Sequence, residues 1–243
     1  MSVFYTAFKK GVAVLVFLVS TPAISLDLNF ITLEVAPWAY HDKVSNKLKG
    51  IFPDLVREID SRTLHTINMT LTPYVRIDRE LESGRQDCTM LIRGVERDKF
   101  VILGELILDH PMGVIPRKDI SLVKYEDLTK VTVSVLRDLN ITDKFDLDKK
   151  IKKQYDTDYE MGLRKMNHKR LDAIAGAIPT IQYLAKTNGM ENMLGEPLEL
   201  SSEPVFFQCS RNSQKNHVIN EFNSIIRQIK SDGVLDEILK KNE

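Results

Sequence analysis

A helix, a short apolar strand and a charged turn follow one another within residues 74–97, and this succession constrains the fold of the 243-residue chain more than any other segment. Ile77 and Leu81 are spaced i, i+4 and Gly84 follows them, which predicts a helix that ends at the glycine. Residues 88–92 (CTMLI) form a short, mostly apolar run, which is typical of a buried strand. A helix that leads directly into such a strand indicates an open α/β sheet.

The charged turn after this strand is a candidate ligand-binding element. It carries Arg93 and Arg97, with Glu96 between them. Open α/β sheets bind ligands in the crevice outside the carboxyl ends of their strands. The alternative is a solvated turn in which Arg97 is a surface residue beside Glu96 and Asp98.

The rest of the chain alternates between strand-like and helical patterns. The helix expected at residues 157–166 opens with a capping box from Thr157 to Glu160. The expected strands are residues 29–35, 66–71, 88–92, 101–108, 112–116, 131–136, 171–175 and 204–209. The expected helices are residues 50–59, 74–83, 142–151, 157–166, 179–186, 214–230 and 232–240, with a short helical turn at 125–128.

These elements fall into two sets that no linker rich in proline, glycine or serine separates. We therefore expect an α/β fold of two lobes, each a mainly parallel sheet flanked by helices, joined by extended crossover strands. Residues 26–117 and 205–243 form the expected lobe 1, and residues 118–204 the expected lobe 2. Two lobes joined in this way favour hinge closure around a ligand.

Residues 1–25 have the pattern of a cleaved secretory signal peptide. Lys9 and Lys10 precede an apolar run at residues 11–19, and small residues lead to an expected cut after Ser25. The alternative is a membrane anchor, but the apolar run is far shorter than the roughly 20 residues needed to span a bilayer. Secretion into the periplasm is the expectation that follows.

Two cysteines, Cys88 and Cys209, lie in apolar strand-like runs. In an oxidising compartment they either form one bridge or stay as buried free thiols. The sequence leaves both alternatives open, because it does not supply the geometry of the pair.

Several kinds of chemistry have no support in the sequence. Acidic and basic residues balance at a formal net charge of zero, and no basic cluster alternates with aromatic residues, so we expect no nucleic-acid partner. No zinc-type histidine spacing, Walker loop, dinucleotide-binding glycine motif or nucleophile elbow is present, so we expect no metal, no cofactor and no catalytic residues. The five histidines are isolated from one another: His41, His65, His110, His168 and His217.

Four stretches, in their order and spacing, resemble the bacterial extracellular solute-binding proteins of family 3. These are type II periplasmic binding proteins of the polar amino-acid type. The resemblance covers nearly all of residues 28–241. The stretches are residues 35–40 with 50–55 (VAPWAY and GIFPDL), residues 81–87 followed by Glu96 and Arg97, residues 170–176 (RLDAIAG), and residues 206–241 with their Ser231-Asp232-Gly233 turn.

The resemblance implies ligand-binding roles for three side chains. Arg97 matches the arginine that grips the ligand carboxylate in amino-acid binders of this family, and a guanidinium is suited to such a bidentate contact. Trp38 and Tyr40 match the aromatic wall of the ligand pocket. For these two aromatic residues the alternative is core packing.

The chain departs from the family pattern in the second lobe. The family has Gly-Asp where this chain has Gly176 and Ala177, so the carboxylate that receives a ligand ammonium is missing. A turn of the Gly-Thr-Thr kind is replaced by residues 137–140 (RDLN), in which Asp138 could restore the missing charge. With Arg97 and Arg137 facing the cleft, these departures favour an anion or a neutral polar solute, because an ammonium buried without a counter-charge is costly.

The resemblance implies a monomeric periplasmic protein that is not an enzyme. It would close over a small polar solute, amino-acid-like or anionic, and present it to an ABC permease or a membrane sensor. Two alternatives stay open. One is an enzyme on the same fold, similar to some dehydratases, for which Glu34, Asp138 and His110 are the candidate acids or bases. The other is an interaction module with a degenerate cleft.

Overall fold

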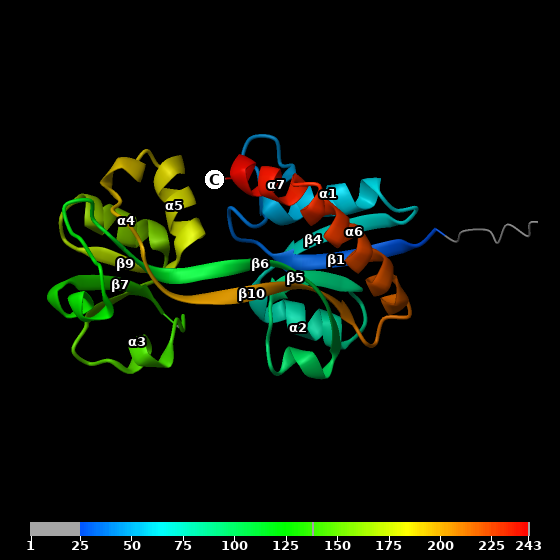
Figure 1. Cartoon of the computed structure of the whole chain (residues 1–243), viewed down its shortest axis with the longest axis horizontal. Coiled ribbons are helices and arrows are strands. Elements are labelled where there is room, and N and C mark those ends of the chain that lie inside the picture. The colour runs from blue at the N-terminus through cyan, green and yellow to red at the C-terminus, as the bar shows by residue number, and fades with distance from the viewer. Residues whose placement is uncertain (1–24, 138, 243) are drawn as a thin grey trace, which may run out of the picture.

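The computed structural model describes residues 25–137 and 139–242 (Figure 1). The predicted signal peptide lies outside the described residues, except for Ser25. Within the described ranges, no helix is long and apolar enough to cross a membrane.

Eight strands form one continuous sheet in the order β4-β1-β5-β10-β6-β9-β7-β8. The strands β1, β4 and β5 are parallel to one another, as are β7, β8 and β9. The strand bounds are β1 Asp27–Leu33, β4 Thr66–Thr72, β5 Cys88–Ile92, β6 Val101–Pro116, β7 Thr132–Leu136, β8 Lys152–Asp156, β9 Ala173–Ala177 and β10 Leu198–Ser210. Two further strands, β2 Tyr40–His41 and β3 Leu48–Lys49, pair separately.

The two longest strands, β6 and β10, join the two halves of the molecule. They pair antiparallel along most of their length and run side by side through the middle of Figure 1. The two segments expected at 101–108 and 112–116 are one strand, and β10 begins at Leu198 instead of residue 204. The expectation of two lobes joined by extended crossover strands is confirmed.

Helices cover both faces of each half of the sheet (Figure 1). We call the half with β1, β4 and β5 lobe 1, and the half with β7, β8 and β9 lobe 2. In lobe 1, α1, α6 and α7 lie on one face and α2 on the other, while in lobe 2 α4 and α5 lie opposite α3. The helix bounds are α1 Ile51–Ser61, α2 Tyr74–Glu82, α3 Asp143–Leu147, α4 Tyr159–Asn167, α5 Ile178–Thr187, α6 Ile219–Ser231 and α7 Val234–Asn242, with short 3₁₀ turns η1 Arg97–Lys99, η2 Tyr125–Lys130, η3 Glu191–Met193 and η4 Asn216–Val218.

Each lobe has its own hydrophobic core. In lobe 1, the ring of Phe207 in β10 stacks with that of Phe30 in β1 and lies against the tilted ring of Phe222 in α6, so that the apolar face of α6 covers the sheet. In lobe 2, separate clusters lie on the two faces of the sheet, with Phe145 in one and Leu163 in the other. Because apolar burial is divided in this way, relative movement of the lobes leaves both cores intact.

Cys88 and Cys209 form a disulfide, which decides between the two alternatives that the sequence left open. The two residues are direct partners in the antiparallel register of β5 and β10. The bridge therefore fastens the returning crossover strand to the parallel strands of lobe 1.

The motif at residues 81–87 proves to be a structural element. The buried Asp87 carboxylate accepts hydrogen bonds from the Asn29 N–H and from the Ser213 hydroxyl, and it pairs with Lys215. Gly84 ends α2 as predicted, at φ 71°, and a side chain there would lie 2.6 Å from the Asn212 carbonyl oxygen. Asp87 and Gly84 thus hold β1, α2 and the segment after β10 together.

Four local predictions were wrong. Strand β8 was missed because its sequence, KKQYD, is polar and lies at an exposed sheet edge, without apolar alternation. The helix expected at 142–151 is shorter than predicted: α3 ends at Leu147, and strand β8 begins at Lys152. The helix expected from residue 214 begins at Ile219, after the 3₁₀ turn η4. The N-cap of α4 is Asp158 and not Thr157, because the Asp158 carboxylate accepts the Met161 N–H at 2.7 Å.

Candidate ligand-binding site

The strand directions bring the carboxyl ends of both parallel sets to the boundary between the lobes. Strand β6 leads from lobe 1 to lobe 2 and pairs antiparallel with β9 and β10. Because β5 is antiparallel to β10, the strands β1, β4 and β5 point toward lobe 2, whereas β7, β8 and β9 point toward lobe 1. Ligands of open α/β sheets bind outside such strand ends.

The loop after β1 is held rigidly where the two sets of strand ends meet. Its Pro37 and Trp38 carbonyls accept the first backbone N–H groups of α1, from Ile51 at 3.0 Å and Phe52 at 2.8 Å. Gly50 lies between at φ 118°, and a side chain there would lie 2.6 Å from the Pro37 oxygen. Only glycine fits this close approach, which explains why the GIFPDL stretch follows the aromatic loop.

Trp38, which was predicted to line the pocket, reaches across to lobe 2. Its indole N–H donates to the Thr180 hydroxyl of α5 at 3.3 Å. Its ring lies against Phe52 at 5.5 Å and edge-on to His110 of β6 at 4.6 Å, measured between ring centroids. The indole is 6% exposed, so this contact between lobe 1, lobe 2 and the crossover strand is largely shielded from water.

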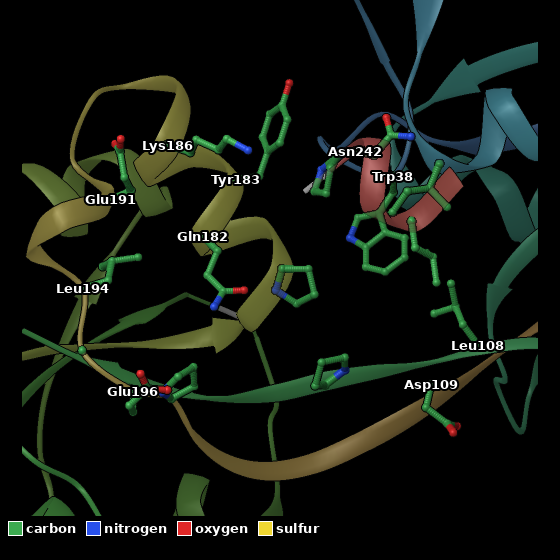
Figure 2. Close-up of a pocket in the computed structure, with 17 residues that line it drawn as sticks. Trp38, Leu108, Asp109, Gln182, Tyr183, Lys186, Glu191, Leu194, Glu196 and Asn242 are labelled. Atoms are coloured by element: carbon green, nitrogen blue, oxygen red, sulfur yellow. The ribbon is translucent and has the colours of Figure 1, made fainter. Parts of the chain in front are cut away.

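A cavity of about 540 Å³ lies beside Trp38, between the lobes (Figure 2). We call it the interlobe cavity. Its wall combines apolar side chains with charges of both signs, from Lys186 and from the carboxylates of Asp109, Glu191 and Glu196. The remaining lining residues are Pro37, Trp38, Ile51, Leu108, Pro111, Pro179, Gln182, Tyr183, Leu194, Gly195, Pro197, Leu239 and Asn242.

The other expected aromatic and basic residues do not line the interlobe cavity. The Tyr40 ring lies 5.8 Å from the ring of Tyr183 in α5, and so also bridges the lobes. Arg93 is exposed and pairs with Asp98 at 2.7 Å. Arg137 is exposed directly after β7. Asp138 lies outside the described residues.

Arg97 is buried, with only 1% of its surface exposed. Its guanidinium donates to the Asp78 carboxylate at 2.5 Å, to the Ile92 carbonyl at 2.7 Å and to the Tyr74 hydroxyl at 2.9 Å. Burial lowers the pKa of Arg97, but the hydrogen bonds and charges of Asp78 and Tyr74 outweigh this effect and raise it overall. Arg97 is therefore not the surface arginine of the alternative interpretation. In this conformation it stabilises the lip of lobe 1, and its contact with a ligand stays a prediction.

At the position of the missing aspartate, the backbone of Ala177 is bonded within lobe 2. The Ala177 N–H donates to the Tyr159 hydroxyl at 3.0 Å. Gly176 allows this approach, since a side chain there would overlap the tyrosine oxygen. Burial raises the pKa of the Tyr159 hydroxyl, which therefore stays protonated and neutral.

Sequence reasoning missed Tyr159 and Thr180 as site residues. Both lie close to the carboxyl ends of lobe 2 strands, and that position was the available signal. Of the residues considered as catalytic acids or bases, Glu34 is exposed and bonds to His41 at 2.9 Å, while His110 is buried. Across the described ranges, no group of three or more histidine, cysteine, aspartate or glutamate side chains is arranged to hold a metal ion.

Burial of His110 makes stability depend on pH. Burial lowers the pKa of the imidazole to about 4, whereas the unfolded chain keeps the ordinary value near 6.5. The unfolded state therefore binds more protons between these values, and stability is lost as the pH falls through this window. We expect this histidine to contribute a loss of about 2 kcal/mol between about pH 6.5 and about pH 4.5. Urea unfolding of the wild type and of His110→Phe across this range measures the difference, and equal pH slopes would contradict the expectation.

The bond between Trp38 and Thr180 predicts a second effect. Thr180→Val keeps the side-chain shape and removes the acceptor, so we expect the contact between lobes to weaken by about 1 kcal/mol. Emission of Trp38, the single tryptophan, should shift to longer wavelength as the indole meets more water. Thr187→Val is the matched control, because this exposed hydroxyl on the same helix bonds only to carbonyls of α5 itself. An unchanged emission spectrum in Thr180→Val would show that the bond does not hold the lobes.

Comparison with known structures supports the architecture at low sequence identity. Substrate-binding domain 2 of Lactococcus lactis GlnP, in its open conformation, aligns with a TM-score of 0.75 at 16% identity, over 91% of this chain and 97% of that one. The ancestral amino-acid-binding protein AncCDT-1 is described as a precursor of cyclohexadienyl dehydratase. It aligns with a TM-score of 0.66 at 20% identity, over 89% of this chain and 94% of that one. A histidine kinase sensor domain with similarity to periplasmic binding proteins aligns with a TM-score of 0.67 at 16% identity, over 90% of this chain and 95% of that one. These likenesses show the fold.

The family is established by a separate comparison. No curated protein sequence matches the chain. The model of the bacterial extracellular solute-binding proteins, family 3, matches residues 29–242, which includes every strand and helix of both lobes except the first residues of β1. The chain therefore belongs to the bacterial extracellular solute-binding proteins of family 3.

Proposed function

We propose that this protein binds a small polar, amino-acid-like solute between its two lobes. Residues 26–117 with 205–243 form lobe 1 in this proposal, and residues 118–204 form lobe 2. The observation that carries the proposal is the contact of Trp38 with Thr180 across the lobes, beside a cavity that both lobes line. A solute that contacts both lobes stabilises the closed form over the open form by its differential affinity.

The walls of the interlobe cavity favour a solute with charges of both signs. Lys186 can meet a carboxylate, and Asp109, Glu191 and Glu196 can meet an ammonium group. This supports an amino-acid-like solute over a simple anion. It also offers an ammonium partner in place of the aspartate that Ala177 replaces.

The proposal includes a place of action and a partner. The mature chain acts in the periplasm as a monomer, without a cofactor, and presents its solute to an ABC permease or a membrane sensor. The family description supports an extracellular place of action. Both kinds of partner have a structural precedent, since the similar structures include the second substrate-binding domain of a putative amino acid ABC transporter from Streptococcus pneumoniae and a histidine kinase sensor domain.

A solute screen by thermal unfolding of residues 26–243 tests the proposal. A true ligand stabilises the folded state by about 2.7 kcal/mol at a hundredfold excess over its dissociation constant, which raises the melting temperature. Trp38→Phe is the variant for comparison: without solute it should be less stable than the wild type, because the indole is buried and bonded to Thr180, and it should gain less stability from the ligand. A library of amino acids, amines and organic acids in which no compound raises the melting temperature would favour the interaction module.

An enzyme is the second candidate, because AncCDT-1 is described as a dehydratase precursor and His110 lies at the lobe boundary. The neutral imidazole could act as a general base. Solutes that raise the melting temperature should be incubated with the protein and followed by NMR. Consumption of one of them, lost in His110→Phe, would establish the enzyme, whereas an unchanged solute supports binding alone.

A further inference from the structure

A second hollow, of about 720 Å³, lies in lobe 1 between the hairpin of β2 and β3 and the helices α1 and α7. We call it the hairpin groove. Its wall carries four cationic side chains from three separate elements. Lys47 and Lys49 come from the hairpin, Arg57 from α1 and Lys241 from α7. Lysines on an exposed hairpin also prevent edge-to-edge pairing of strands, but that role does not explain the cations from the two helices.

Among the described residues that line the groove, one carboxylate accompanies these cations, that of Asp54. Its side chain is 9% exposed, pairs with Arg57, and accepts hydrogen bonds from Lys241 at 3.0 Å and from Asn242 at 3.1 Å. Burial raises the pKa of Asp54, but the bonds from Asn242 and Lys241 outweigh this effect and lower it overall. Asp54 is therefore ionised and holds the helix cations in place, with a single negative charge.

The hairpin cations keep an excess of positive charge over the groove. Lys49 pairs with Asp42 at 2.8 Å, whereas Lys47 is exposed and has no ion pair within the described part of the chain. Even with Asp42 counted, four cations stand against two carboxylates. The whole chain has a formal net charge of zero, so this excess is a local property of the groove.

The hairpin is preformed and does not need a partner to fold. The Asp42 carboxylate accepts the Ser45 N–H at 2.8 Å and the Ser45 hydroxyl at 2.6 Å, which closes the turn. Asn46 takes the left-handed conformation at φ 54° and donates its N–H to the Asp42 carbonyl at 2.8 Å. Because the turn is fixed by its own bonds, a partner that binds there does not pay for ordering it.

The groove also reaches the boundary between the lobes. Tyr40 belongs to its wall, and the Tyr40 ring lies 5.8 Å from the ring of Tyr183 in lobe 2. Asn242 lines both the groove and the interlobe cavity, where Figure 2 shows it close to Trp38. A partner seated in the groove therefore lies next to contacts that change when the lobes move.

We propose that the hairpin groove binds an acidic peptide segment of a protein partner, whose carboxylates pair with the four cations of the wall. A concave surface with cations on three elements fits a chain segment that carries several carboxylates, whereas a flat lipid surface would meet mainly the hairpin. The inference rests on the proposed function in that the membrane partner would supply the segment. Exposed charges of this kind act mainly on the rate of association and on its salt dependence.

The test is fluorescence anisotropy of a fluorescein-labelled octaglutamate peptide with the mature chain at low ionic strength. The peptide should bind saturably with 1:1 stoichiometry, lose affinity as salt is added, and bind far more tightly than labelled octaglutamine. Lys47→Glu should weaken binding by about tenfold, because repulsion replaces attraction in the wall. Lys241→Gln, on another element, should weaken it severalfold. Circular dichroism and the melting temperature confirm that each variant is folded.

Lys149→Glu is the matched control. It makes the same change of net charge at an exposed lysine of lobe 2 that also has no ion pair among the described residues, so the peptide affinity should stay within about twofold. Equal losses in Lys47→Glu and Lys149→Glu would show a general effect of net charge and overturn the proposal. Absence of peptide binding at low ionic strength would also overturn it.

Two further measurements separate this inference from its neighbours. Vesicles that contain phosphatidylglycerol would assign the groove to a lipid surface if they bind in a Lys47-dependent way while the peptide does not. The solute screen does not depend on the groove, so Lys47→Glu should keep the rise in melting temperature with solute. A solute that binds without any peptide binding would leave the proposed function standing and remove this site, and peptide binding without any library solute would do the reverse.

Discussion

Replacing Cys88 and Cys209 together with alanine is expected to lower the free energy of unfolding by about 4 kcal/mol. The bridge joins residues that are 121 positions apart in sequence, so its removal gives the unfolded chain a large gain in conformational entropy. It also frees β10 from β5 in the core of lobe 1. Urea unfolding of the mature wild type and of the double variant measures the difference.

The reduced wild type is the control for the cysteine pair, because it keeps both sulfur atoms and lacks only the bond. It should lie close to the double variant in stability. A reduced form within about 1 kcal/mol of the oxidised form would show that the bridge contributes little.

Arg97→Met should lower the free energy of unfolding by about 3 kcal/mol. The change keeps an unbranched apolar stem but leaves the Asp78 carboxylate, the Ile92 carbonyl and the Tyr74 hydroxyl without the guanidinium that donates to them. The Asp78 side chain is 43% exposed, so water replaces part of the lost interaction. The expected loss of stability is therefore at the lower end of the range for breaking a buried ion pair. The same urea titration gives the value.

Arg93→Met is the matched control for Arg97. Arg93 lies on the same turn but is exposed and pairs only with Asp98 among the described residues, so we expect a change within about 0.5 kcal/mol. Equal stability of the two variants would contradict the structural role of Arg97. The pair also tests its ligand role: loss of an anionic solute in folded Arg97→Met, with binding kept in Arg93→Met, would assign the ligand carboxylate to Arg97.

Local patterns predicted the architecture well. Apolar periodicity identified the elements of both lobes, and the absence of a linker identified the crossover strands. Trp38 was predicted as a site residue from the resemblance to family 3, in which it matches the aromatic wall of the ligand pocket. The edge strand β8 was not predicted, because a strand at an exposed sheet edge can form without apolar residues.

Contacts between distant segments could not be predicted in the same way. The disulfide depends on the register of β5 against β10, which the sequence does not state. The burial of Arg97 depends on Asp78, a helical residue 19 positions earlier whose orientation follows from the packing of α2. Thr180 becomes a site residue only because the loop after β1 extends across the lobe boundary. Such pairings come from the folded arrangement and not from local pattern.

The central claim is that a solute binds between the lobes, where Trp38 meets lobe 2. The most direct test is a fluorescence titration of the mature chain with the solute that most raises its melting temperature, since Trp38 is the single tryptophan. We expect a saturable change in Trp38 emission with 1:1 stoichiometry, at the dissociation constant that calorimetry gives. A solute that stabilises the protein at such concentrations and leaves the emission of Trp38 unchanged would contradict it.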